Sequence, residues 1–209
     1  MRQLTKIPFY RVCISTAAAS GLLGIFVAWN FYLHERSLHV NQDQAGIAER
    51  EVITDTSGLT SIRLAYHDFE SANAGDTASH LAAMGHRGNQ SLKMSPRVQF
   101  SPGLWIKFRD LNPGDSSWIR ATGYVWFSCP PGEVKCSLVA TCNHNGVNFK
   151  YMFIALEKEN LKPNQWNRVS IDYRIPKALN PEDVLQAYFW YRGTGEALVD
   201  DVEVTMLRK

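Results

Sequence analysis

From about Leu59 to its end, the chain is a series of short segments rich in Val, Ile, Tyr, Phe and Trp. The separators "NPGD", "CPPGEVK", "NHNG", "KPNQ" and "GTGE" are composed largely of residues that favour tight turns. Short strands at this spacing, with no strong helical period between them, are typical of antiparallel sandwiches and barrels. The sequence therefore predicts an all-β domain over residues 59–209.

The same pattern places the individual strands, and "NHNG" between two of them predicts a hairpin. The expected strands lie within residues 61–69, 90–102 (one or two strands), 117–129, 135–143, 147–157, 165–176, 183–193 and 196–207.

Residues 12–33 contain no charged side chain. As a helix they would measure about 33 Å, enough to cross a hydrocarbon core of about 30 Å. The basic residues of segment 1–11 precede this stretch, which predicts a cytoplasmic N-terminus and a periplasmic or extracellular C-terminal domain. We therefore expect an uncleaved signal anchor, a single transmembrane helix, followed by a polar stalk over residues 34–58.

The balance of charge excludes one class of partner. From residue 34 onward the chain carries 19 basic and 20 acidic residues. A general nucleic-acid-binding surface needs a basic excess, so none is expected.

Motifs for catalysis are missing as well. The sequence has no G-x-S-x-G, H-E-x-x-H or phosphate-binding glycine loop. Glu70 and Asp200 could be imagined as a glycosidase pair, but the central strands hold no mid-strand pair of glutamates. The sequence therefore predicts a protein that is not an enzyme and has no catalytic residues.

Two predicted strands carry aromatic residues on both faces. On the less apolar faces, these aromatics alternate with polar and basic residues that could bond sugar hydroxyls. Such faces can equally form a second packed layer or a surface for a protein partner. The candidate ligand-binding residues are Arg120, Tyr124, Trp126, Tyr188 and Trp190.

Three cysteines follow the anchor, where disulfides are permitted. Cys129 and Cys136 flank the "PPGEVK" turn, which predicts a disulfide across a hairpin. Cys142 would then be left without a partner. A zinc site formed by the three thiols and His144 has suitable ligand types, but its spacing matches no known finger.

Asp200 is the most unusual acid in the predicted sheet. Strand alternation places it on one face with Val202, Val204 and Met206, where an unpaired carboxylate would be costly. Asp201 falls on the opposite, mixed face. Asp200 therefore needs a cation, a set of N–H donors or a position at the rim.

The order of several motifs resembles a known group of domains. "DFE" at 68–70 is followed by "GHRGNQSLKM" at 85–94, by "QWNRV" and by the closing "ALVDDVEV". This order is similar to that of jelly-roll domains grouped with carbohydrate-binding modules and the galactose-binding-like fold. The sequence as a whole resembles those of envelope proteins of Bacteroidetes-type bacteria. The resemblance covers about residues 62–207 and implies a jelly-roll β-sandwich.

The resemblance also implies a structural Ca²⁺ site where the first and last strands meet. Glu70 and Asp200 match the side-chain ligands, and the backbone near Lys93 would complete the oxygen shell. The alternative is a metal-free rim in which both acids accept backbone N–H groups or meet Arg63 or Lys93.

For function, we expect a membrane-anchored, non-catalytic module that binds glycan or another envelope polymer. The alternative is an accessory or scaffold subunit of an envelope complex. Such a subunit would use the β-sandwich and a stripe of small residues in the anchor as interfaces.

Overall fold

A computed structural model describes residues 51–70, 80–113 and 116–209. The predicted anchor and most of the stalk lie outside the described residues. Among the helices that the structure does describe, none has the length and apolar character needed to span a bilayer.

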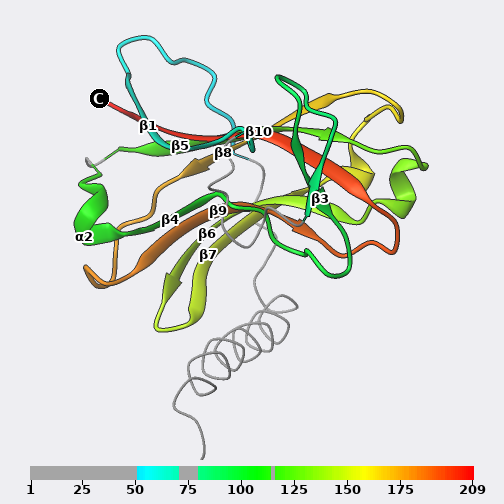
Figure 1. The fold of residues 1–209 in the computed structure, drawn as a ribbon. Coiled ribbons are helices and arrows are strands. Elements are labelled where there is room, and N and C mark those ends of the chain that lie inside the picture. Colours follow the sequence, from blue (N-terminus) through cyan, green and yellow to red (C-terminus); the bar gives the residue numbers. More distant parts are fainter. Residues whose placement is uncertain (1–50, 71–79, 114–115) are drawn as a thin grey trace, which may run out of the picture.

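The described chain forms two antiparallel sheets packed face to face, which confirms the predicted all-β sandwich (Figure 1). Sheet A has the order β2-β3-β10-β5-β8, with β1 also paired to β10, and sheet C has the order β4-β9-β6-β7. From β3 to β10, successive strands change sheets at every connection except the β6–β7 hairpin, as jelly-roll winding requires. The strands of sheet A are β1 (Thr60–His67), β2 (Leu81–Ala82), β3 (Ser91–Met94), β5 (Trp118–Trp126), β8 (Asn167–Arg174) and β10 (Ala197–Arg208). Those of sheet C are β4 (Leu104–Lys107), β6 (Cys136–His144), β7 (Val147–Ala155) and β9 (Val184–Tyr191).

Within the described ranges, three short helices lie between these strands. They are α2 (Phe108–Leu111), η2 (Pro131–Glu133) and η3 (Leu156–Lys158). The predicted "NHNG" hairpin joins β6 to β7, where Asn145 and Gly146 both have positive φ. Two such residues in succession suit the twist of a tight β-hairpin.

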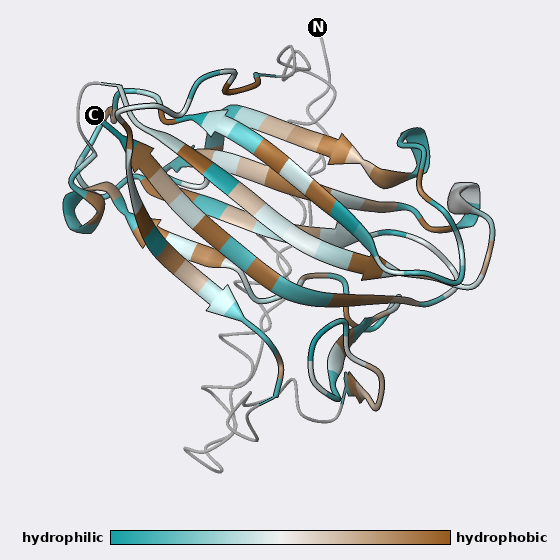
Figure 2. Cartoon of the chain, turned by 90° about the horizontal axis from the view of Figure 1, so that it is seen from above, coloured by the Kyte–Doolittle hydropathy of each residue, from teal (hydrophilic) through white to brown (hydrophobic). Residues whose placement is uncertain are grey.

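The main core lies between the sheets and follows the alternation seen in the sequence (Figure 2). On β5, Ile119 and Val125 point inward and are fully buried, while Arg120 and Tyr124 point outward. Gly123 also occupies an inward position. A Cβ there would lie 2.6 Å from the ring of Phe189 on the opposite sheet, so glycine leaves room for that ring.

The alternation predicted for β10 fails at a β-bulge. The pairing of β10 with β5 shifts between Asp200 and Glu203, and Asp201 has a φ of 47°. The extra residue puts Asp200 opposite the outward Tyr124, whereas Val204 faces the inward Ala121. Asp200 therefore does not share a face with the valines that follow it, because a bulge reverses the phase of a strand.

The predicted disulfide is wrong in this structure, since Cys129, Cys136 and Cys142 are all free. The prediction assumed that β5 and β6 form a hairpin. They belong instead to different sheets, and Cys136 on β6 lies opposite Tyr191 on β9. Burial raises the pKa of Cys136 and of Cys142 to about 12, so both thiols stay protonated.

Candidate functional site

The five predicted ligand residues lie on opposite sides of the sandwich. Arg120, Tyr124 and Trp126 point outward from β5 in sheet A. Tyr188 and Trp190 point outward from β9 in sheet C. The structure therefore does not bring the five together into one site.

On sheet A, Arg120 is held by a neighbouring strand. Its Nε and Nη2 donate to the two carboxylate oxygens of Asp172 on β8, at 2.6 and 2.9 Å. Asp172 is buried and also accepts the backbone N–H of Ile53. A bidentate pair of this kind fixes the guanidinium, so Arg120 secures the sheet.

Tyr124 is covered by a residue that sequence reasoning missed. The ring of His86 stacks on the Tyr124 ring with their centroids 3.4 Å apart. His86 Nδ1 lies 2.7 Å from Oδ2 of Asp201, and the Tyr66 hydroxyl donates to Oδ1 at 2.6 Å. This hydrogen bond to Asp201 raises the pKa of Tyr66 to about 12. The β-bulge at Asp201 directs its side chain toward His86. No motif in the local sequence indicates this bulge, so the contact could not be predicted.

On sheet C, six aromatic side chains gather on the side that faces away from the core. We call this surface the aromatic face; it consists of Phe100, Trp105, Tyr151, Phe153, Tyr188 and Trp190.

The two ends of the aromatic face differ in exposure. Trp190 is only 6% exposed, its ring stacks with Phe100 at 6.3 Å, and the guanidinium of Arg192 lies 4.2 Å from its centroid. Trp105 is 60% exposed and lies opposite Gln186 of β9. Trp105 was not among the predicted ligand residues, because the short strand β4 that carries it was not recognised.

The polar groups of the aromatic face are neutral or basic. Thr141 Oγ1 donates to Oδ1 of Asn148 at 2.9 Å, and Lys107 pairs with Glu182 at 2.8 Å. No carboxylate occupies an outward position of β4, β6, β7 or β9, all of which are described along their whole length. The arrangement offers stacking surface and hydrogen bonds, and it supplies no acid or base pair.

The two predicted calcium ligands, Glu70 and Asp200, both bond to one loop. Oε1 of Glu70 accepts the backbone N–H groups of Asn89 and Gln90 at 2.8 and 2.7 Å. Asp200 accepts N–H groups from His86 and Asp201 at 2.6 and 2.7 Å. Both acids thus satisfy backbone donors, as the metal-free alternative expects.

Two other residues of the predicted metal sets have side-chain partners. The Lys93 side chain pairs with Glu196 at 2.7 Å, whereas the calcium prediction concerns the backbone near Lys93. His144 Nδ1 lies 2.6 Å from the buried Asp183. Within the described residues, no three His, Cys, Asp or Glu side chains are grouped closely enough to hold a metal ion.

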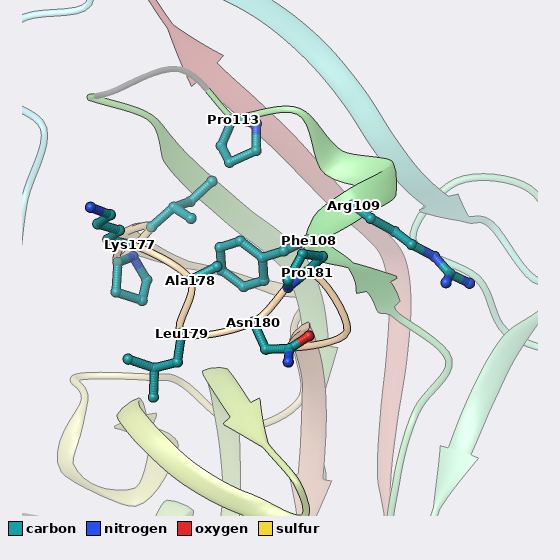
Figure 3. Close-up of a pocket in the computed structure, with 10 residues that line it drawn as sticks. Phe108, Arg109, Pro113, Lys177, Ala178, Leu179, Asn180 and Pro181 are labelled. Carbon is teal, nitrogen blue, oxygen red and sulfur yellow. The ribbon is translucent and has the colours of Figure 1, made fainter.

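One pocket of about 520 Å³ opens at the end of the sandwich, between α2 and residues 175–181 (Figure 3). Phe108, Ile175 and Pro181 contribute apolar walls, and Arg109 lies at the rim. Arg109 is already paired with Glu182. Among the described residues that line it there is no carboxylate, cysteine or histidine, and Lys177 is the lining residue that could act as a base or nucleophile.

Comparison with protein families finds no matching family, and comparison with curated proteins finds no match. Among solved structures, the CBM22-1 xylan-binding domain of Paenibacillus barcinonensis Xyn10C is 17% identical, with a TM-score of 0.47 over 71% of this chain and 97% of that chain. The CBM22-2 xylan-binding domain of the same protein is 18% identical, with a TM-score of 0.42 over 68% and 98%. A family 16 carbohydrate-binding module is 14% identical, with a TM-score of 0.38 over 59% and 82%. At these identities and scores the alignments decide nothing about this chain, whose sandwich is established by its own strand pairing.

Proposed function

We propose that this chain is a non-catalytic module that binds glycan on the aromatic face of sheet C and is held at a membrane by residues 12–33. The supporting observation is Trp105, a large ring that is 60% exposed beside Gln186 on a face whose strands carry no outward carboxylate. A flat indole can stack on the C–H surface of a sugar, while amide and hydroxyl groups bond its hydroxyls. Trp105 also extends a cluster of aromatic side chains, and contiguous apolar patches of this kind mark ligand-binding or interaction surfaces.

Geometry favours sheet C over sheet A for this role. On sheet A, Tyr124 is covered by His86, and Arg120 is occupied by Asp172. On sheet C, the ring of Trp105 is exposed to solvent. Gln186 lies opposite it, and the Gln186 side-chain amide is a group that can hydrogen-bond a sugar hydroxyl. The glycan would therefore lie across β4 and β9.

Affinity electrophoresis of the fragment 51–209 through gels containing different polysaccharides tests this proposal. The fragment suits the test because the residues of the main core, as far as the structure describes them, lie between positions 62 and 206. At least one polysaccharide should retard the fragment, and Trp105→Ala should abolish the retardation. Trp126→Ala, an aromatic truncation on sheet A, should leave it unchanged.

Two outcomes would contradict the proposal. Retardation lost in Trp126→Ala but kept in Trp105→Ala would move the site to sheet A. No retardation by any polysaccharide, together with a stoichiometric protein partner on purification of the full chain, would favour the accessory-subunit alternative.

A further inference from the structure

One cation is fixed at the end of the aromatic face that is distant from Trp105. Arg192 follows the last residue of β9, and its guanidinium lies 4.2 Å from the centroid of the Trp190 ring. Its Nη2 donates to the buried hydroxyl of Ser137 on β6 at 2.8 Å. The cation–π contact and the hydrogen bond together restrict the position of the guanidinium. Arg192 is nevertheless an exposed residue, so its charge is both held in place and accessible.

This charge has no carboxylate partner within the described residues. Lys107, the basic side chain at an outward position of β4, pairs with Glu182 at 2.8 Å. None of the ion pairs in the described part of the chain involves Arg192. A guanidinium has five N–H donors, and Ser137 accepts from one of its nitrogens. Arg192 therefore keeps donors that an anion can use.

The residues near Arg192 add positive charge. Its backbone N–H donates to the carbonyl oxygen of Lys135 at 2.6 Å, and Lys135 is also exposed. Two acids occur at this end, Glu133 in η2 and Glu157 in η3, and within the described residues neither forms an ion pair with the two cations. The strands of sheet C carry no outward carboxylate. An anion therefore meets attraction at this end of the face.

Arg192 lies within reach of a chain that also contacts Trp105. Gln186, opposite Trp105, shares the outward face of β9 with Tyr188 and Trp190. From Gln186 to Trp190 the strand extends for about 13 Å, a distance longer than one sugar ring. A polysaccharide that lies on Trp105 and follows β9 would therefore place a different sugar unit beside Arg192.

The chemistry of the guanidinium indicates which anion suits it. Its planar arrangement of N–H groups matches the two oxygens of a carboxylate. A sugar unit that carries a carboxylate is a uronic acid. A neutral glycan offers hydroxyl groups, which form weaker hydrogen bonds with a guanidinium than a carboxylate does.

We propose that the glycan bound on the aromatic face contains uronic acid, and that its carboxylate pairs with Arg192 while another sugar unit stacks on Trp105. This inference rests on the proposed function, because it names the class of ligand for that site.

Isothermal titration calorimetry of fragment 51–209 tests this class with glucuronoxylan, polygalacturonate and alginate. Each polymer is used in its native form and after chemical reduction of its carboxyl groups to hydroxymethyl groups, which keeps the linkages and removes the charge. At least one native polymer should bind about tenfold more tightly than its reduced form. Arg192→Gln should remove this difference by weakening the binding of the native polymer alone. Unchanged binding of the reduced polymer also shows that the variant is folded.

Arg168→Gln is the matched control. Arg168 is an exposed arginine on β8 of sheet A, where it lies opposite the outward Tyr124. This variant removes the same charge from the other side of the sandwich, so the preference for the native polymer should remain. Trp105→Ala should abolish the binding of both forms.

The other results would overturn the inference in distinguishable ways. Equal binding of native and reduced polymers, lost in Trp105→Ala, would leave the glycan site and remove the uronic acid. An equal loss of preference in Arg168→Gln would assign it to the overall charge of the fragment. Tight binding of carrageenan, a sulfated polymer without uronic acid, that is lost in Arg192→Gln would assign the site to sulfate esters. No binding of any polymer, neutral or acidic, would remove the proposed function itself.

Discussion

Asp201 combines an unfavourable backbone with a buried charge. Its φ of 47° lies in the left-handed region, and its side chain is 6% exposed. Bonds from Tyr66 and His86 offset both costs. In Asp201→Asn, the backbone can keep the same φ, but the negative charge is lost. The new side-chain NH₂ group then faces either the Tyr66 hydroxyl or His86 Nδ1, both of which donate to the carboxylate of Asp201. We expect it to lower the free energy of unfolding by about 1–3 kcal/mol, measured by urea denaturation at neutral pH.

The exposed pair beside the bulge provides a control for this measurement. Glu203 bonds to Arg63, which is largely exposed, and pairs of this kind contribute about 0–1 kcal/mol. Glu203→Gln should therefore cost clearly less than Asp201→Asn. Equal costs would show that the bond network of Asp201 does not stabilise the bulge.

Asp200 should make stability depend on pH in the direction opposite to that of a salt-bridged acid. Burial raises its pKa to about 6, against the lowering effect of the two N–H groups that it accepts. The folded chain therefore keeps a proton that the unfolded chain releases near pH 4. The contribution of Asp200 is most favourable below pH 4 and is lost as the pH rises through 6.

The carboxyl resonance of Asp200, followed by NMR, should titrate with a midpoint near pH 6. From pH 4 to pH 6, the stability of the wild type should fall relative to that of Asp200→Asn. Titratable or charged groups close to Asp200 are Asp201, His86, Arg87 and its cross-strand partner Tyr124. The variant His86→Gln distinguishes titration of the imidazole from titration of the Asp200 carboxyl. A midpoint below pH 4 would contradict this account.

At the scale of an element, Glu70 and Asp200 fasten residues 86–90 to the sheet. Both N–H groups that reach Glu70 meet the same oxygen, Oε1. Glu70→Gln keeps a carbonyl oxygen for them, whereas Glu70→Ala leaves them to water. We expect the amides of Asn89 and Gln90 to exchange hydrogen much faster in Glu70→Ala and only slightly faster in Glu70→Gln.

The same loop allows a test of the predicted calcium site against the metal-free alternative. If the two acids serve backbone donors alone, EDTA and added Ca²⁺ should leave the melting temperature unchanged. A rise in the melting temperature with Ca²⁺ that disappears in Asp200→Asn would establish the metal site.

The elements show where sequence reasoning succeeds and where it stops. The strands β5, β6, β7, β8 and β9 were predictable because each is long, β-branched or aromatic, and bounded by turn residues. The short strand β4 has only four residues and ends where α2 begins, so no turn residue marks its end, and Trp105 was missed with it. The bulge at Asp201 has no glycine to reveal its positive φ, and the covering of Tyr124 by His86 depends on contacts between distant segments. Residue types thus predict the layers, whereas the site depends on pairing between distant strands.

At the scale of the whole molecule, the proposed glycan site lies within residues 51–209. All the strands that carry the aromatic face belong to this part of the chain. Fragment 51–209 should therefore bind a retarding polysaccharide as tightly as the full chain does, and Trp105→Ala should abolish binding in both.

Glu51 joins the two sheets at one edge of the sandwich. Its carboxylate accepts bonds from Lys150 on β7 of sheet C and from the backbone N–H of Arg174 on β8 of sheet A. Glu51→Ala removes these bonds and should lower the free energy of unfolding of fragment 51–209 by about 1–2 kcal/mol, measured by urea denaturation. Lys107→Ala breaks the pair with the exposed Glu182 and should cost only about 0–1 kcal/mol. Equal costs would show that Glu51 does not hold the two sheets together, because its bonds would then contribute no more than a surface pair.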